Sequence, residues 1–286
     1  MKLLSLCTGY GGLDLAVEEF FAAELIGCAD IDKSANLAIE KHFGVPNYGD
    51  IRNILNLDIE FDILTAGYPC QPFSHAGQRK GINDERHIWP HIAEIISKFR
   101  PGIVVLENVR GHLSLGFLEV LKDLTKIGYD ARWQIVRASD VGAPHQRARL
   151  FVVAYTNSTT REQSRRTDRA IRGKGSQIVD GSDRKEPGSG FEALSNTHAK
   201  QLSTNGQMSR LGRRFATRSE LSMQANPDPL VDGRLNVEYV EYMMGLPKGW
   251  VTDLPISRAQ QFKLLGNGVV PQQAFYALEQ LWRHAV

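Results

Sequence analysis

The sequence predicts an α/β protein in which a doubly wound, mostly parallel sheet carries helices on both faces and a smaller, basic domain is attached. Short apolar runs alternate with amphipathic stretches up to about residue 155, as expected for the strand–helix units of a parallel sheet. From about residue 156 Ser, Thr, Gly, Arg and Asp dominate, and few apolar residues remain to be buried. We therefore expect a first domain from 1–155 plus 262–286 and a small domain from 156–261.

The alternation places each expected element in order. Strands are expected where short apolar runs are bounded by turn residues, and helices where apolar residues recur at the helical period. The expected strands are Leu3–Cys7, Leu25–Ala29, Phe61–Ala66, Ile103–Leu106, Trp133–Val136 and Leu150–Ala154. The expected helices are Leu13–Phe21, Ala35–Phe43, Ile92–Phe99, Phe117–Ile127, Val237–Gly245 and Gln272–His284. Ligands of such sheets bind at the carboxyl ends of the strands.

Length and composition describe a globular chain with an uneven charge. Its 286 residues are 42% hydrophobic, which supports a substantial core. The net charge is +2, but residues 156–220 contain 13 basic and 7 acidic residues and carry +6, whereas the rest carries −4. This excess predicts a surface that faces a polyanion, and a solvated basic linker is the alternative.

The cysteines and apolar runs exclude several classes of protein. Cys7, Cys28 and Cys70 are odd in number and lack Cys-x-x-Cys spacing, so neither a disulfide framework nor a cysteine-based metal site is supported. No segment approaches the roughly 20 apolar residues that span a bilayer. We expect a protein of a reducing cytoplasm with no metal and no membrane contact.

A glycine-rich loop, Cys7-Thr-Gly-Tyr-Gly-Gly12, joins the first expected strand to the first expected helix. Its glycines allow a ligand to approach the backbone, although a tight structural turn would use the same residues. The spacing differs from the Gly-x-Gly-x-x-Gly of dinucleotide enzymes. Asp30 ends the second strand, where acids bind ribose hydroxyls, and Asp50-Ile51 offers a carboxylate and an apolar flank for a purine. These features indicate a nucleotide-like cofactor.

Cys70 lies in Gly67-Tyr-Pro-Cys-Gln-Pro-Phe-Ser74, a proline-bracketed turn that follows an apolar strand. An inert buried thiol is the common alternative, but such a turn packs poorly in a core, so its position favours a nucleophile. The thiolate is the reactive form, and Arg147 and Arg149 supply candidate positive charge at the edge of another strand. A solvated strand face would also explain the alternating arginines.

Glu107 follows four apolar residues, so we expect burial to raise the pKa of its carboxyl group. It could then donate a proton or a hydrogen bond near neutrality, and a capping or salt-bridging glutamate is the structural alternative. A thiolate and an acid at one sheet edge suit conjugate addition, in which sulfur attacks an unsaturated ring and the acid neutralises the nitrogen where charge develops.

As an ordered set, these segments resemble those of the DNA cytosine-5 methyltransferase family over about residues 1–155 and 234–286. The similarity comprises the cofactor loop, the nucleophile segment, the acid segment, the paired-arginine segment and two closing motifs. In that order they are Cys7-Thr-Gly-Tyr-Gly-Gly12, Gly67-Tyr-Pro-Cys-Gln-Pro-Phe-Ser74, Glu107-Asn-Val109, His145-Gln-Arg-Ala-Arg149, Met243-Met-Gly-Leu-Pro247 and Leu265-Gly-Asn-Gly-Val-Val-Pro271.

The resemblance implies a Rossmann-like methyltransferase that uses S-adenosylmethionine, releases S-adenosylhomocysteine and needs no metal. It implies that Cys70 adds to C6 of a cytosine flipped out of duplex DNA while Glu107 protonates or hydrogen-bonds N3. Arg149 is implied at the cytosine O2, with Arg147 supporting the site. The implied cofactor-binding residues are Cys7, Thr8, Gly9, Tyr10, Gly11, Gly12, Asp30, Ile31, Asp50, Ile51, Pro69, Asn267 and Val269.

Three features depart from the family pattern. Phe is usual where Cys7 stands, which leaves adenine stacking to another side chain such as Ile31, and Gln is usual where His145 stands. In the expected helix from Asn236 to Gly245, Val237-Glu238-Tyr239 replaces the usual Pro-Arg-Glu pattern, so we assign no structural role to its glutamate. None of these departures touches Cys70 or Glu107.

Residues 156–233 correspond in position to the family's target-recognition segment, so double-stranded DNA is the implied partner. The densest late cluster of predicted DNA contacts is Arg210, Arg213, Arg214 and Arg218. We expect a monomer in the cytoplasm of a bacterial cell or phage-infected host, and the family admits a cognate restriction endonuclease as a separate partner.

Three alternatives compete with this interpretation. An RNA cytosine-5 methyltransferase would keep the chemistry, and the long basic insert argues against it. A non-catalytic DNA-binding relative would not need Cys70 and Glu107. A nicotinamide or flavin oxidoreductase lacks support from the glycine spacing and leaves Cys70 unexplained.

Overall fold

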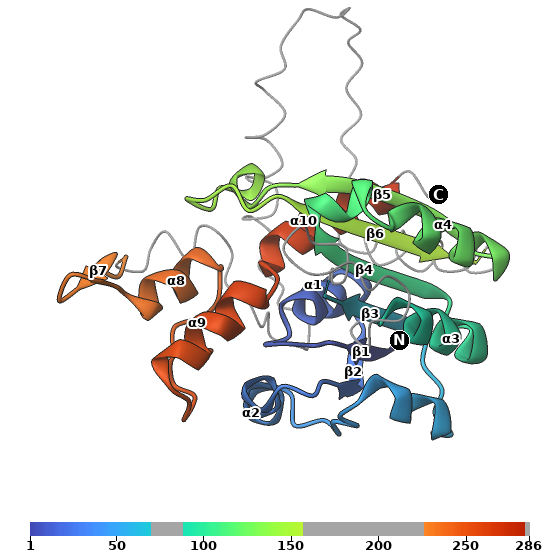
Figure 1. The fold of residues 1–286 in the computed structure, drawn as a ribbon, viewed down its shortest axis with the longest axis horizontal. Helices are drawn as coiled ribbons and strands as arrows, with labels where there is room; N and C mark the ends of the chain where they lie inside the picture. The colour runs from blue at the N-terminus through green and yellow to red at the C-terminus, as the bar shows by residue number, and fades with distance from the viewer. Residues whose placement is uncertain (70–87, 157–225, 284–286) are drawn as a thin grey trace, which may run out of the picture.

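The computed structural model describes residues 1–69, 88–156 and 226–283, and the strands in these ranges form the expected mostly parallel sheet (Figure 1). The six strands lie in the order β2-β1-β3-β4-β6-β5. Neighbours pair in parallel except β6, which is antiparallel to both β4 and β5. Their bounds are β1 Lys2–Leu6, β2 Glu24–Ala29, β3 Ile63–Gly67, β4 Ile103–Val109, β5 Asp130–Val136 and β6 Arg149–Tyr155.

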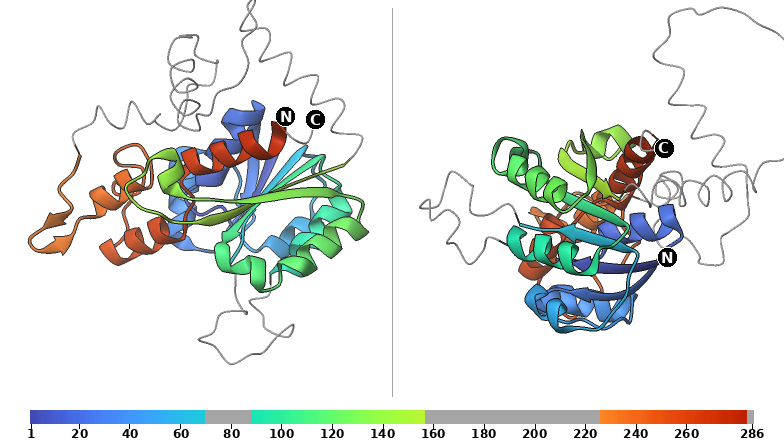
Figure 2. Two further views of the ribbon diagram at one scale, coloured as in Figure 1. Left: turned by 90° about the horizontal axis from the view of Figure 1, so that it is seen from above. Right: turned by 90° about the vertical axis from the view of Figure 1, so that its right-hand side faces the viewer.

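Helices cover both faces of this sheet, which confirms the doubly wound class (Figure 2, right). α1 and α10 pack on one face, and α3 and α4 pack on the other. The helices are α1 Gly12–Phe21, α2 Lys33–His42, α3 Trp89–Phe99, α4 Phe117–Lys126, α8 Val237–Met243, α9 Arg258–Asn267 and α10 Pro271–Arg283. Short 3₁₀ turns are η1 Ile51–Asn56, η3 Arg110–Ser114 and η4 Ala138–Val141. None of the helices in the described ranges is long and apolar enough to cross a membrane.

The central strands are buried on both faces, which is why they read as continuous apolar runs. Leu64 and Val104 belong to the core that contains α3 and α4. Ile63 and Ile103, one residue earlier in each strand, belong to the core that contains α1 and α10. Successive residues of a strand point to opposite faces, so each apolar run supplies both cores.

The direction of β6 decides which of its ends reaches the site. Because β6 runs against β4, its first residue pairs with the last residue of β4, Arg149 with Val109. Glu107, two residues back along β4, pairs with Phe151. The start of β6 therefore lies at the same edge as the carboxyl ends of β1 to β4.

Residues 226–267 add a smaller unit at that edge, where α8, α9 and the hairpin of β7 (Leu230–Val231) and β8 (Arg234–Leu235) lie together (Figure 1). A third core joins this unit to the first part of the chain, and Trp250 and Leu265 share it with Tyr10 and Leu15. The predicted domain boundary between residues 261 and 262 falls within α9, and the division into two domains stays a prediction.

Glu241 on α8 fixes the loop that follows this helix. The carboxylate is 1% exposed; its Oε1 accepts the backbone N–H groups of Val251 (2.5 Å) and Thr252 (2.9 Å). Its Oε2 accepts the Gly249 N–H (2.8 Å) and the Thr252 hydroxyl (2.9 Å). Four donors on one buried carboxylate form a strong anchor, because hydrogen bonds to charged groups are stronger than neutral ones.

We predict that Glu241→Gln lowers the free energy of unfolding by about 2–4 kcal/mol, because the new amide N–H₂ faces donors and leaves buried groups unsatisfied. Urea denaturation measures this loss. The matched control is Glu238→Gln on the same helix, where the side chain is exposed and the expected loss is less than about 1 kcal/mol. Equal losses for the two variants would contradict the anchoring role.

Candidate active site

The carboxyl ends of the parallel strands bring the predicted site segments to one edge. The glycine loop follows β1, Asp30 follows β2, Gly67 ends β3 and Glu107 lies near the end of β4. Gly67 pairs with Glu107 in the sheet, and a Cβ placed on Gly67 would lie 3.6 Å from Glu107 Oε2. Cys70 lies outside the described residues, three positions after Gly67 in the sequence.

Glu107 is a buried acid that pairs with a partly buried arginine. Its side chain is 8% exposed, and its Oε1 lies 3.1 Å from Nε of Arg149, whose side chain is 18% exposed. Burial raises the pKa of Glu107 to about 7, against the opposing charges of Arg149 and Arg147. The predicted direction of this pKa shift is confirmed. A carboxyl group that titrates near neutrality can donate a proton or a hydrogen bond at physiological pH.

The two arginines of the 145–149 segment have different partners. Arg149 pairs with Glu107, whereas Arg147 turns toward the segment between α9 and α10. One guanidinium nitrogen, Nη2, donates to the carbonyl oxygens of Gly266 (2.7 Å) and Gly268 (2.6 Å). Arg147 has φ of 34°, and Gln273 Nε2 donates to its carbonyl oxygen (2.8 Å). Arg147 thus fixes the segment that contains Asn267 and Val269.

We predict that Arg147→Ala weakens binding of S-adenosylhomocysteine about tenfold, a loss of about 1.4 kcal/mol, because the segment carrying Asn267 and Val269 loses its two hydrogen bonds. Isothermal titration measures the change. Arg147→Lys is the matched variant, since it keeps the charge but has one flexible ammonium in place of the planar donor group. Unchanged affinity in Arg147→Ala would show that this contact does not shape the cofactor site.

The glycine loop packs against the distant segment that Arg147 holds. A Cβ on Gly12 would lie 2.0 Å from the Val269 carbonyl oxygen, and one on Gly268 would lie 1.9 Å from the Tyr10 ring. The Tyr10 hydroxyl donates to that same carbonyl oxygen (2.7 Å). Protein atoms fill the space beside Gly12, so the missing side chain of this glycine allows two chain segments to pack closely. Gly9, with φ of 58°, has no atom within 4 Å of an added Cβ and leaves room for a ligand.

Asp30 and Ile31 form the side of the site next to β2. The Asp30 carboxylate accepts the N–H groups of Gly9 (2.8 Å) and Asp32 (2.8 Å), which ties the glycine loop to the end of β2. Burial raises the pKa of Asp30. Ile31 is 76% exposed, so its side chain is available to an aromatic ring.

Asp50 and Ile51 differ from Asp30 and Ile31, because Asp50 is bound by a neighbouring arginine and Ile51 is buried. Arg52 binds both carboxylate oxygens of Asp50, Nε at 2.9 Å and Nη2 at 2.5 Å, and the hydrogen bond lowers the pKa of Asp50 to about 2. Ile51 is 4% exposed and packs in the core beneath α3. The predicted contacts of both residues with a purine stay predictions.

The residues at this edge fit the adenosine end of S-adenosylmethionine. Asp30 offers carboxylate oxygens where ribose hydroxyls are expected, Ile31 exposes an apolar surface beside it, and the space at Gly9 is open. The cofactor roles assigned to all thirteen residues, Cys7, Thr8 and Pro69 included, stay predictions. Burial raises the pKa of the Cys7 thiol to about 12, so this cysteine is a neutral neighbour of the site.

Five predicted site residues lie outside the described ranges: Cys70, Arg210, Arg213, Arg214 and Arg218.

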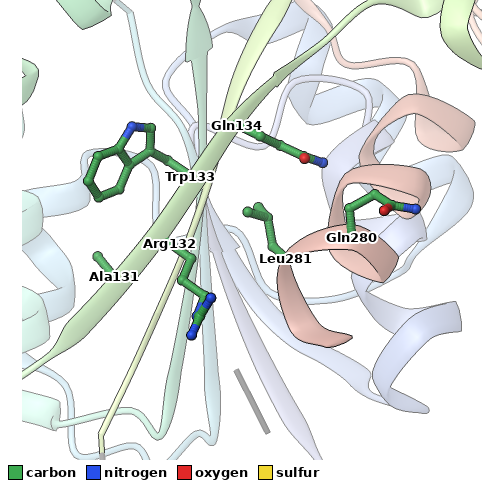
Figure 3. Close-up of a pocket in the computed structure, with 6 residues that line it drawn as sticks. All are labelled: Ala131, Arg132, Trp133, Gln134, Gln280 and Leu281. Carbon is green, nitrogen blue, oxygen red and sulfur yellow. The ribbon is translucent and has the colours of Figure 1, made fainter. Parts of the chain in front are cut away.

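A hollow on the described part of the protein lies away from the predicted site. The hollow lies between β5 and α10, and its lining includes Gln134, Gln280 and Leu281, while Trp133 points to the other side of the strand (Figure 3). No predicted site residue lines it. Among the described residues, no His, Cys, Asp or Glu cluster could hold a metal ion.

Sequence reasoning missed several supports of the site. Trp250 donates from Nε1 to the Tyr10 carbonyl oxygen (3.0 Å), and Lys263 on α9 pairs with Asp32 (2.6 Å). α9 itself was not among the expected helices, because only Leu264 and Leu265 are buried along it. Its start did carry a signal, the Ser257 and Gln260 capping box.

The fold is that of solved methyltransferases. The *S. pombe* Dnmt2 methyltransferase has a TM-score of 0.61 at 18% identity, covering 98% of this chain and 99% of that one. A putative DNA modification methyltransferase encoded within an *E. coli* prophage has a TM-score of 0.62 at 20% identity, covering 99% of each chain. At these identities the likeness establishes the Rossmann-like fold alone.

The sequence comparison gives the family. Residues 1–210 match the family described as C-5 cytosine-specific DNA methylase, and the chain belongs to this family. The Type II methyltransferase M.DsaV of *Dactylococcopsis salina* is 34% identical over 167 residues, which are 56% of this chain and 47% of that protein. The chain thus spans about half the length of that relative. M.MspI of *Moraxella* sp is 27% identical over 304 residues, covering 98% of this chain and 70% of its own.

Proposed function

We propose that this protein is a site-specific DNA (cytosine-5)-methyltransferase. The observation that carries the proposal is the buried Glu107–Arg149 pair at the carboxyl edge of the sheet, beside the strand end that leads into Cys70. An acid with a pKa of about 7, beside the strand end that precedes a cysteine nucleophile in the sequence, suits addition to a pyrimidine ring. Family membership and the Type II relatives support DNA as the substrate.

The residues act on a cytosine that has left the duplex, because base pairing and stacking otherwise bury the ring. The Cys70 thiolate forms a bond to C6, and Glu107 donates its proton to N3, so that C5 becomes nucleophilic as an enamine carbon. S-adenosylmethionine, when bound, supplies an electrophilic methyl group. Transfer of the C5 proton to solvent water, return of the N3 proton to Glu107 and departure of the Cys70 thiolate restore the aromatic ring.

Arg149 serves two groups in this proposal. It holds the Glu107 carboxyl group in place and contacts the cytosine O2, where its positive charge stabilises negative charge that develops on the ring. Arg147 holds the segment with Asn267 and Val269 against the glycine loop and so shapes the cofactor side.

Residues 156–261 form the smaller domain in this proposal, and its basic segment lies along DNA. Arg210, Arg213, Arg214 and Arg218 contact phosphates and base edges. By the Type II naming of the relatives, we propose that methylation protects the sites of a separate restriction endonuclease. We further propose that the protein is a monomer and acts in the cytoplasm of a bacterial cell or phage-infected host.

The test is incorporation of label from tritiated S-adenosylmethionine into separate DNA and RNA pools. Label in DNA, converted to 5-methylcytosine at one sequence by bisulfite mapping, is the expected result. Label in RNA alone would replace DNA as the substrate, and no label in either pool would favour a non-catalytic DNA-binding protein. DNA with 5-fluorocytosine at the methylated position should trap a covalent adduct, because fluorine cannot leave as the proton does.

A further inference from the structure

Tyr68 connects the end of β3 to the end of β4. Its carbonyl oxygen accepts a hydrogen bond from Asn108 Nδ2 (3.0 Å), and its hydroxyl lies 2.9 Å from His112 Nε2. Tyr68 precedes Cys70 by two residues, and Asn108 directly follows Glu107. The tyrosine therefore links the segment that carries the nucleophile to the strand that carries the acid.

The partners of His112 define its tautomer. Nδ1 lies 2.9 Å from the Leu115 carbonyl oxygen, which can only accept, so Nδ1 carries a proton. Burial lowers the pKa of His112, so the ring is neutral and Nε2 is an acceptor. The Tyr68 hydroxyl accordingly donates to Nε2. Both ring nitrogens have partners, and the hydrogen bond orients the phenol ring.

The Tyr68–His112 pair is buried among aromatic rings. Tyr68 is 5% and His112 is 4% exposed, and the two rings pack edge to face at 5.6 Å. The Trp89 ring of α3 packs against Tyr68 with centroids 5.7 Å apart, and the Phe117 ring of α4 packs against His112 with centroids 5.9 Å apart. The hydrogen bond is therefore shielded from water on the side of α3 and α4, and breaking it would leave a buried polar group unsatisfied.

We propose that His112 is a positioning residue for the methyl transfer: through the Tyr68 hydroxyl it fixes Tyr68, which precedes Cys70 by two residues, relative to Glu107. This inference rests on the proposed function, which makes Cys70 and Glu107 the two groups whose relative position matters. A displacement of about 1 Å between reacting groups can cost up to roughly 100-fold in rate, so an anchor two residues from the nucleophile affects chemistry more than binding.

The test compares four variants with the full-length wild type in single-turnover methylation and in adduct formation with 5-fluorocytosine DNA. We expect His112→Leu and Tyr68→Phe each to lower both rates about tenfold, with the KM for S-adenosylmethionine changed less than about twofold. His112→Gln, which keeps an acceptor near the Nε2 position, should retain at least about half of the wild-type rate. The double variant Tyr68→Phe/His112→Leu should be no slower than His112→Leu, because each change removes the same Tyr68–His112 hydrogen bond.

Tyr129→Phe is the matched control, because Tyr129 is equally buried and its hydroxyl donates to Pro101 at the opposite edge of the sheet. The proposal is overturned if Tyr129→Phe slows methylation as much as Tyr68→Phe, or if His112→Leu keeps the wild-type rate. It is also overturned if the losses of the double variant add. Should Tyr68→Phe not fold, the double variant replaces both polar partners by apolar groups and restores a measurable protein. A wild type that labels no DNA refutes the proposed function instead, before any variant is compared.

Discussion

Cys70→Ala is expected to abolish methyl transfer, with incorporation of label into DNA reduced by about 10⁴-fold or more. The reason is that the ring carbon C5 of cytosine is a poor nucleophile until a thiolate adds to C6. Without sulfur no route to the enamine remains, and Glu107 alone cannot activate the ring. The measurement is tritium incorporation under single-turnover conditions, together with the absence of an adduct on 5-fluorocytosine DNA.

The matched control is Cys28→Ala. Cys28 is fully buried, and burial raises the pKa of its thiol to about 12, so it is an inert core residue. We expect this variant to methylate DNA at close to the wild-type rate, with only a modest loss of stability. If Cys70→Ala were as active as Cys28→Ala, the covalent mechanism would have to be abandoned.

Glu107→Gln should lower the single-turnover rate by about 10²- to 10³-fold, because the amide can donate a hydrogen bond to N3 but cannot transfer a proton. DNA binding should change little, since Glu107 is buried beside Arg149 and acts on one ring atom. Glu119→Gln on α4, an exposed glutamate, is the matched control and should leave the rate unchanged. Similar rates for the two variants would remove Glu107 from the chemistry.

The raised pKa of Glu107 gives this prediction a pH signature. The wild-type rate should fall as pH rises above about 7, because the carboxyl group loses the proton that it must donate, and the Glu107→Gln rate should lack this fall. The stability of the folded protein also depends on the protonation of Glu107. Its folded pKa lies above the ordinary value of 4.5, so the stability that protonation contributes is complete below about 4.5 and is lost as pH rises through about 7. Urea denaturation at several pH values across this range should show the loss in the wild type and not in Glu107→Gln.

Part of the candidate site could be predicted from the local sequence, and individual residues show which contacts could not be predicted. Glu107 could be predicted to be buried because four apolar residues precede it in β4. Glu241 could not be recognised, because three of its four donors are backbone N–H groups of residues 249–252 that no side-chain pattern reveals. Arg147 and Arg149 read alike in the sequence, yet they bind groups on different elements.

The sequence by itself determined the order of strands and helices up to residue 155 and the placing of acid, glycine loop and nucleophile at strand ends. It could do so because parallel strands are buried on both faces and their carboxyl ends meet at one edge. Only the tertiary structure decided that β6 runs backwards, which brings Arg149 to Glu107, and that Gly12 and Gly268 let Tyr10 and Val269 meet. These contacts join residues far apart in the chain, and their geometry depends on how whole elements pack rather than on any local pattern.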